Sequence, residues 1–141
     1  MVESIENTSS VKPNNARPLP FILKAAALLL IVYGIIGLGY YLFTTIFSLS
    51  NPQFLENIEF NNFKGNTLFI PVTIKILVHI SIVLSGFLIF YKKKAGRWFF
   101  YFSLFFSLFF FIVFTSYINY AEIVIGFLVL VILFVYRSRL S

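Results

Sequence analysis

The sequence predicts an all-α integral membrane protein with four transmembrane helices arranged as two hairpins. Hydrophobic residues make up 60% of the 141 residues and charged residues only 11%, so a soluble domain of this length would lack the polar surface to cover its core. The apolar residues also come in runs long enough to cross a bilayer. Two of these runs are joined by a short basic segment, Lys92–Trp98, which predicts a hairpin bend at the membrane surface.

The first span is expected over about residues 21–49, after a polar, proline-containing stretch over 1–20 that should be a disordered cytoplasmic tail. Roughly 20 residues suffice to cross a bilayer, so this longer helix must tilt or protrude. Small residues on one side of such a helix let another helix approach closely in lipid. The predicted packing face consists of Tyr33, Gly34, Gly37 and Thr44.

A polar connection follows the first span and is expected to be extracytoplasmic. Asn51 as N-cap and Pro52 at the first helical position favour a short helix lying on the membrane surface. An irregular loop is the alternative. The second span is expected over about residues 70–91, because Pro71 is tolerated in the first turn of a helix.

The basic segment should form the inner turn between the second and third spans. Ala95 and Gly96 are expected to make the tight turn, and Trp98 to begin the third span at headgroup level, over about residues 98–115. Four positive charges beside two spans act as a topology anchor, and that anchor consists of Lys92, Lys93, Lys94, Arg97 and Trp98.

Two serines of the third span, Ser103 and Ser107, are four residues apart and form a small notch where a neighbouring helix could pack. The fourth span is expected over about residues 119–136, followed by a short basic cytoplasmic tail over 137–141. Four spans place both termini and the basic turn on one side of the membrane.

The distribution of Lys and Arg predicts which side that is. The other side carries only Lys64 and Lys75. An excess of Lys and Arg marks the cytoplasmic side, so both termini are expected in the cytoplasm and the protein in the plasma (inner) membrane. The cytoplasmic set is Lys12, Arg17, Lys24, Lys92, Lys93, Lys94, Arg97, Arg137 and Arg139.

Three ionisable residues, Lys75, His79 and Glu122, lie within or near the later spans and form a candidate intramembrane polar site. Lys75 and His79 are four residues apart on the second span, and Gly86 continues the same face as a further packing residue. Such a face could line a proton or ion path.

Each of these residues also has a structural interpretation. The Lys75 stem could extend to the outer surface, and Glu122 could cap its helix together with Asn119. These interpretations can coexist, since the two residues lie at similar depth on the outer side and could form an ion pair between the second and fourth spans. A neutral His79 could bond to a hydroxyl on a neighbouring helix, such as that of Tyr33 or Thr44.

Composition argues against several functions. The absence of Cys excludes disulfides and thiolate chemistry, and His79 is the only histidine. We find neither a nucleophile, base and orienting group nor a metal-ligand set, so we expect no enzymatic activity, no cofactor and no metal. The formal charge of +6 is explained by residues at span ends, which fit the bilayer and its anionic headgroups better than nucleic acid.

The chain resembles a loose class of small bacterial four-span membrane proteins. The matching features are Arg17 and Pro18 before the first span, Gly34 and Gly37 within it, and a basic turn followed by Gly96, Arg97 and Trp98. This resemblance covers most of the chain and implies a membrane location, but no particular activity.

Three functions remain open at this stage. We expect a non-enzymatic helix-packing or accessory module that associates with itself or with a larger membrane partner through its small and polar residues. The alternative is a small transporter or channel subunit that uses His79 with Lys75 and Glu122 as an ion or proton site. A bacteriocin-immunity or stress-response membrane protein would have the same sequence features as the first.

Overall fold

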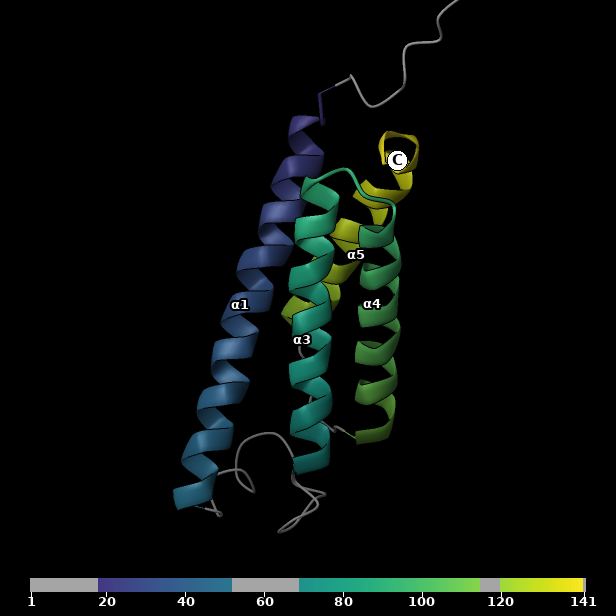
Figure 1. Ribbon diagram of the computed structural model, residues 1–141. Helices are drawn as coiled ribbons and strands as arrows, with labels where there is room; N and C mark the ends of the chain where they lie inside the picture. Colours follow the sequence, from purple (N-terminus) through teal and green to yellow (C-terminus); the bar gives the residue numbers. More distant parts are fainter. Residues whose placement is uncertain (1–17, 52–68, 115–119, 141) are drawn as a thin grey trace, which may run out of the picture.

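The computed structural model describes residues 18–51, 69–114 and 120–140, and all regular structure in these ranges is helical. Figure 1 shows the helices side by side, with the start of α1, the α3–α4 turn and the C-terminal residues at the same end of the bundle. The helices are α1 (Phe21–Ser50), α3 (Phe69–Phe90), α4 (Ala95–Phe114), α5 (Tyr120–Val135) and the short 3₁₀ helix η3 (Arg137–Arg139).

Three of these helices, α1, α3 and α4, are long and apolar enough to cross a membrane. The fourth, α5, has 16 residues, and at 1.5 Å per residue it is about 24 Å long, shorter than the ~30 Å hydrocarbon core. The predicted all-α class is therefore confirmed, and the length and composition of three helices are compatible with membrane spans. The four-span hairpin arrangement stays a prediction.

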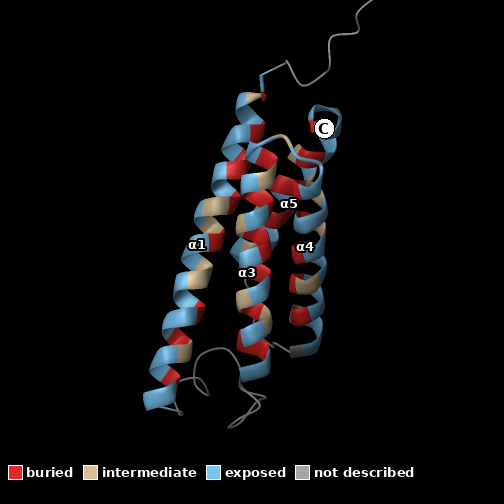
Figure 2. Cartoon of the chain, in the orientation of Figure 1, coloured by how far each residue is buried: buried red, intermediate tan, exposed pale blue. Residues whose placement is uncertain are grey.

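The polarity of the bundle is compatible with a protein that is surrounded by lipid. Large apolar side chains point outward, with exposed fractions of 83% for Phe21, 79% for Ile112 and 67% for Phe127. Figure 2 shows this exposed surface along the whole length of the helices. A soluble protein would not expose apolar surface on this scale. Several polar side chains, in contrast, are buried between the helices. The buried polar set is Thr44, Ser48, Lys75, His79, Ser81, Ser85, Ser103 and Ser107.

Helix α3 is central, because it packs along both α1 and α4. Helix α5 has few residues whose backbone lies near another helix, and more of them lie near α1 than near any other helix. The core between the helices includes Leu30, Ile82, Phe100 and Leu133, so α5 still contributes side chains to it.

The turn between α3 and α4 differs from the prediction. Ala95 and Gly96 were expected to form it, but they are the first two residues of α4. The turn lies at Lys92–Lys94, where Lys92 adopts a left-handed conformation with φ of 60°. The Lys92 N–H bonds to the Ile89 carbonyl at 2.9 Å and the Lys93 N–H to the Leu88 carbonyl at 2.8 Å, which is a Schellman closure of α3.

Gly96 serves close packing rather than the turn. A Cβ atom at this position would lie 2.8 Å from the Ile89 backbone nitrogen and 3.0 Å from the Ser85 carbonyl oxygen. The Ser85 hydroxyl donates to the Gly96 carbonyl at 2.8 Å. The two helices therefore meet closely just below the turn, and Trp98 lies in the first turn of α4 instead of beginning it.

Several predictions fall on residues outside the described ranges. These are the tail up to residue 17, the surface helix expected after Asn51, and the connection before α5 that includes Asn119. Asn51 itself closes α1, since its N–H bonds to the Phe47 carbonyl at 3.0 Å.

Candidate functional site

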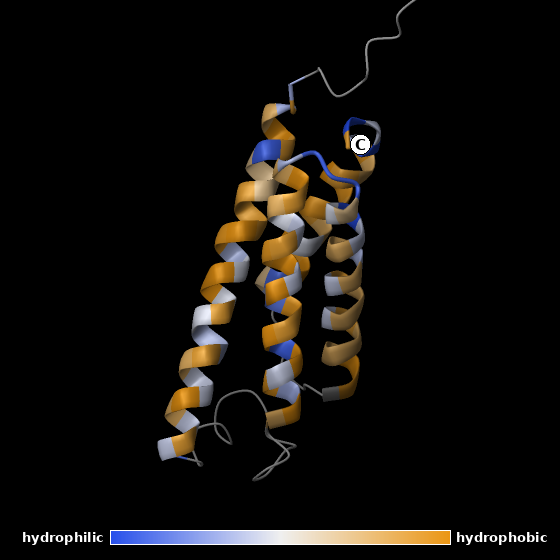
Figure 3. Ribbon diagram, in the orientation of Figure 1, coloured by the Kyte–Doolittle hydropathy of each residue, from blue (hydrophilic) through white to orange (hydrophobic). Residues whose placement is uncertain are grey.

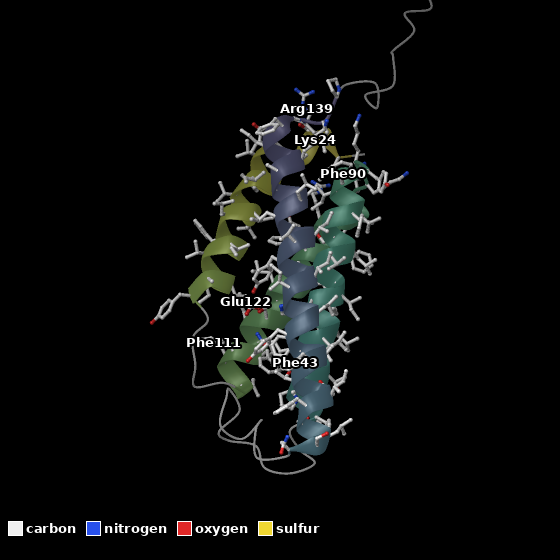
Figure 4. The ribbon with its side chains drawn as sticks, turned by 90° about the vertical axis from the view of Figure 1, so that its left-hand side faces the viewer. Lys24, Phe43, Phe90, Phe111, Glu122 and Arg139 are labelled. Carbon is white, nitrogen blue, oxygen red and sulfur yellow. The ribbon has the colours of Figure 1, made fainter. Side chains whose placement is uncertain are left out.

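An ion pair between two helices forms the centre of the candidate site. The Lys75 Nζ atom on α3 lies 3.1 Å from the Glu122 Oε2 atom on α5, and the two side chains are only 9% and 14% exposed. Figure 4 labels Glu122 among the side chains between the helices. The two residues were expected at similar depth, and the structure brings them together.

A third helix, α4, forms a hydrogen bond with the same carboxylate. The Ser107 hydroxyl on α4 donates a hydrogen bond to the second oxygen of Glu122, Oε1. Both carboxylate oxygens are therefore engaged, one by an ammonium group and one by a hydroxyl. The side chain of Glu122 links α3, α4 and α5.

The ammonium group of Lys75 is directed into the bundle rather than toward the surface. It also lies 4.9 Å from the centre of the Phe110 ring, in a cation–π contact with a fully buried side chain. Val72 and Tyr41 pack in the same cluster. The alternative of a Lys75 side chain extending to the outer surface is therefore wrong.

His79 lies one turn further along α3, in contact with α1. Its Nδ1–H donates to the Lys75 carbonyl oxygen at 2.9 Å, so the imidazole bonds to the backbone of its own helix. Its ring lies 5.7 Å from the Tyr33 ring and 5.3 Å from the Tyr41 ring. The Thr44 hydroxyl, one of the expected partners, instead donates to the Tyr41 carbonyl at 3.0 Å.

Gly37 provides the space for this imidazole. A Cβ atom at Gly37 would overlap the His79 ring at its Cδ2 and Nε2 atoms. A Cβ atom added at Gly34 would lie 3.2 Å from the His79 carbonyl oxygen, and one added at Gly86 would lie 2.8 Å from the Ala27 carbonyl oxygen on α1. These glycines let α1 and α3 approach closely within one chain.

The remaining predicted packing residues also lie inside the bundle. Ser103 is buried and donates to the Phe99 carbonyl at 2.7 Å. A cavity of about 30 Å³ lies next to it, where α1, α3, α4 and α5 meet, and Tyr33, Ser103, Ser107 and Glu122 contribute to its lining. This volume is enough for one or two water molecules and too small for an organic substrate.

The basic residues expected to anchor the topology lie together at the other end of the bundle. Figure 3 shows the α3–α4 turn and the C-terminal residues as the hydrophilic end. The Arg97 Nη1 group donates to the Arg137 carbonyl at 3.2 Å and so joins α4 to η3.

Sequence reasoning missed several residues of the site. Gly126 on α5 faces Leu104, with 2.9 Å between an added Cβ and that side chain, and Phe110 contacts Lys75. The four-residue spacing of Ser81 and Ser85 was a signal for a buried face that went unused. Among the described residues, no group of three metal-ligating side chains is present.

In comparisons with protein-family models, curated proteins and solved structures, none matched this chain. Its function must therefore be argued from the site itself.

We predict that breaking the ion pair on one side destabilises the fold more than removing both charges. Lys75→Met leaves a buried carboxylate and Glu122→Gln leaves a buried ammonium, so each should cost about 3–5 kcal/mol. The double variant should lose clearly less than the sum. Unfolding in mixed micelles, followed by the fluorescence of the single tryptophan Trp98, measures these differences.

Lys24→Met is the matched control, since it removes an exposed cation near the start of α1 and should change stability by less than about 0.5 kcal/mol. Additive losses in the double variant would show that the two side chains do not stabilise the fold as a pair.

Proposed function

We propose that the protein is a small, non-enzymatic integral membrane protein that acts by associating with a second copy of itself or with a larger membrane partner. In this proposal four helices cross the plasma membrane as two hairpins, and both termini are cytoplasmic. The apolar exterior, the buried polar side chains and the basic end of the bundle support it.

The observation that carries the association is the environment of Gly39 on α1. The glycines at 34, 37, 86, 96 and 126 all lie against other side chains or helices of this chain, whereas a Cβ at Gly39 would have nothing within 4 Å. A glycine in a helix interior costs about 1 kcal/mol relative to alanine. Gly39 is exposed, and close packing within this chain does not require a glycine there.

The surroundings of Gly39 form an outward apolar face. Ile35, Ile36, Leu42 and Phe43 are 55%, 67%, 48% and 63% exposed, and they flank Gly39 at helical spacings of three and four. A small residue between large apolar ones makes a notch that another helix can enter in lipid. The proposed contact face of α1 is therefore opposite to the one expected from the sequence, because Gly34 and Gly37 are occupied within the chain.

We predict that Gly39→Leu fills this notch and converts an oligomer of the parent protein, or its complex with a partner, to the monomer. The substitution has open space around it, so the fold should be kept and helix propensity improved. Light scattering of the purified protein in a mild detergent measures the molecular mass.

Gly37→Leu is the matched comparison two residues away. Its side chain would collide with His79, so it should lower stability by about 1–3 kcal/mol through overpacking. A parent protein that is monomeric and co-purifies with nothing would refute the association.

The proposed topology can be tested by labelling, because the chain has no native cysteine. Single cysteines at Ser10 and Ser138 should react with an impermeant maleimide only after the membrane is opened, whereas one at Asn62 should react in intact cells. Labelling of Ser138→Cys from outside while Ser10→Cys stays protected would mean that α5 does not cross the membrane.

A second candidate function, an ion or proton site, is favoured by one observation. Lys75, Glu122 and Ser107 converge from three helices, and His79 bonds to the Lys75 carbonyl. Ser107 and Glu122 also line a cavity that can hold water. Intramembrane ionisable groups often form proton or ion paths.

This candidate predicts that His79→Ala abolishes a proton flux that the parent protein supports in liposomes. A dye trapped inside the liposomes reports the flux, and Leu84→Ala, on an exposed position of the same helix, is the control. A parent protein whose flux equals that of empty liposomes would eliminate the candidate.

A further inference from the structure

The described residues gather their positive charges at one end of the bundle. Figure 4 labels Lys24 and Arg139 near that end, together with Phe90 at the end of α3. The only carboxylate side chain in the described ranges is Glu122, and it is bound to Lys75 and Ser107. The basic end consists of Lys24, Lys92, Lys93, Lys94, Arg97, Arg137 and Arg139.

The backbone holds the lysines of this end in a fixed turn. The Schellman bonds close α3 at Lys92 and Lys93, and two more bonds begin α4, from the Gly96 N–H to the Lys93 carbonyl and from the Arg97 N–H to the Lys94 carbonyl, each at 3.1 Å. The side chains of Lys93 and Lys94 are exposed. Two neighbouring ammonium groups are therefore presented by a hydrogen-bonded turn.

The arginines are tied to the same place. Arg97 donates to the Arg137 carbonyl, and Leu140, which follows η3, is only 3% exposed and packs in the core cluster that contains Leu19 and Leu23 at the start of α1. The short helix that carries Arg137 and Arg139 is thus fixed by a hydrogen bond on one side and by a buried leucine on the other. The backbone that carries these cations is already ordered, so the ordering entropy lost on binding an anion is mainly that of the side chains.

Aromatic side chains indicate the depth of these cations in a membrane. Tyr91 and Trp98 flank the turn and are 68% and 71% exposed. Tyr and Trp side chains are enriched at the headgroup level of both membrane interfaces. Arg137 lies over the Phe134 ring at 5.4 Å, which turns its guanidinium toward the apolar part of α5.

From this arrangement we infer that the basic end is a binding surface for anionic phospholipid headgroups, with Lys93, Lys94, Arg137 and Arg139 as its exposed cations. A phosphodiester at the depth of Tyr91 and Trp98 meets ammonium and guanidinium groups from two segments that are already fixed together. The ordered backbone distinguishes this surface from charges on an unstructured segment beside a span. The apolar flank makes a lipid a better partner than a soluble polyanion.

The test is lipid selectivity of the full chain in nanodiscs made from equal amounts of phosphatidylcholine and phosphatidylglycerol. Native mass spectrometry of the released protein counts the lipids that remain bound. Each Lys or Arg near an anionic surface contributes about a fivefold preference. Lys93→Gln with Lys94→Gln should therefore lower the preference for phosphatidylglycerol roughly 25-fold, and raised salt should lower it for the parent protein.

Lys93→Arg with Lys94→Arg is the control, since it keeps both charges at the same positions and should keep the preference. Equal retention of both lipids by the parent protein, or an unchanged preference in the Gln variant, would overturn the inference. So would binding of soluble glycerol 3-phosphate without any lipid preference. Because this readout does not involve oligomeric state, its failure would leave the proposed association at Gly39 untouched.

Discussion

The ion pair between Lys75 and Glu122 determines where α5 lies. Lipid tails are as apolar as leucine, so burial of apolar surface gives membrane helices little reason to associate. Helix α5 is short and has few close backbone approaches to its neighbours, so its attachment relies not only on the core side chains Val129 and Leu133 but also on polar bonds. Glu122 supplies two of them, to Lys75 and to Ser107. Moving α5 away would strand a carboxylate and an ammonium group in apolar surroundings, which costs several kcal/mol.

The interface between α1 and α3 is built in a different way. Glycines at 34, 37 and 86 remove side-chain volume where the helices meet, so backbone and ring atoms come into direct contact. His79 fills the space left by Gly37 between two tyrosine rings of α1. Its bond to the Lys75 carbonyl ties this packed interface to the residue that holds α5. The turn of α3 from Lys75 to His79 therefore contacts the closely packed helix α1 through His79 and the loosely packed helix α5 through Lys75.

The helices could be predicted from the sequence because a bilayer imposes a length on apolar runs, and the observed bounds differ from the predicted ones by three residues at most. The meeting of Lys75 and Glu122 followed from their similar depth. The role of Ser107 and the space for His79 at Gly37 depend on how each helix is rotated about its axis, which the distribution of apolar residues around these helices does not specify. The turn was misplaced because Lys92 occupies a left-handed conformation that glycine normally takes at a helix end.

The polar groups of the site favour a static link over a route for ions. Among the described residues, every fully buried side-chain nitrogen and oxygen has a hydrogen-bond partner, and the cavity beside Glu122 has room for only one or two waters. A transport site needs an alternative partner or a second arrangement for its charges, and the described part of the chain offers Glu122 as its only carboxylate. Arg97 and Arg137 attach the opposite end of α5. Polar bonds therefore hold α5 near both of its ends, at Glu122 in its first turn and at Arg137 just after its last residue.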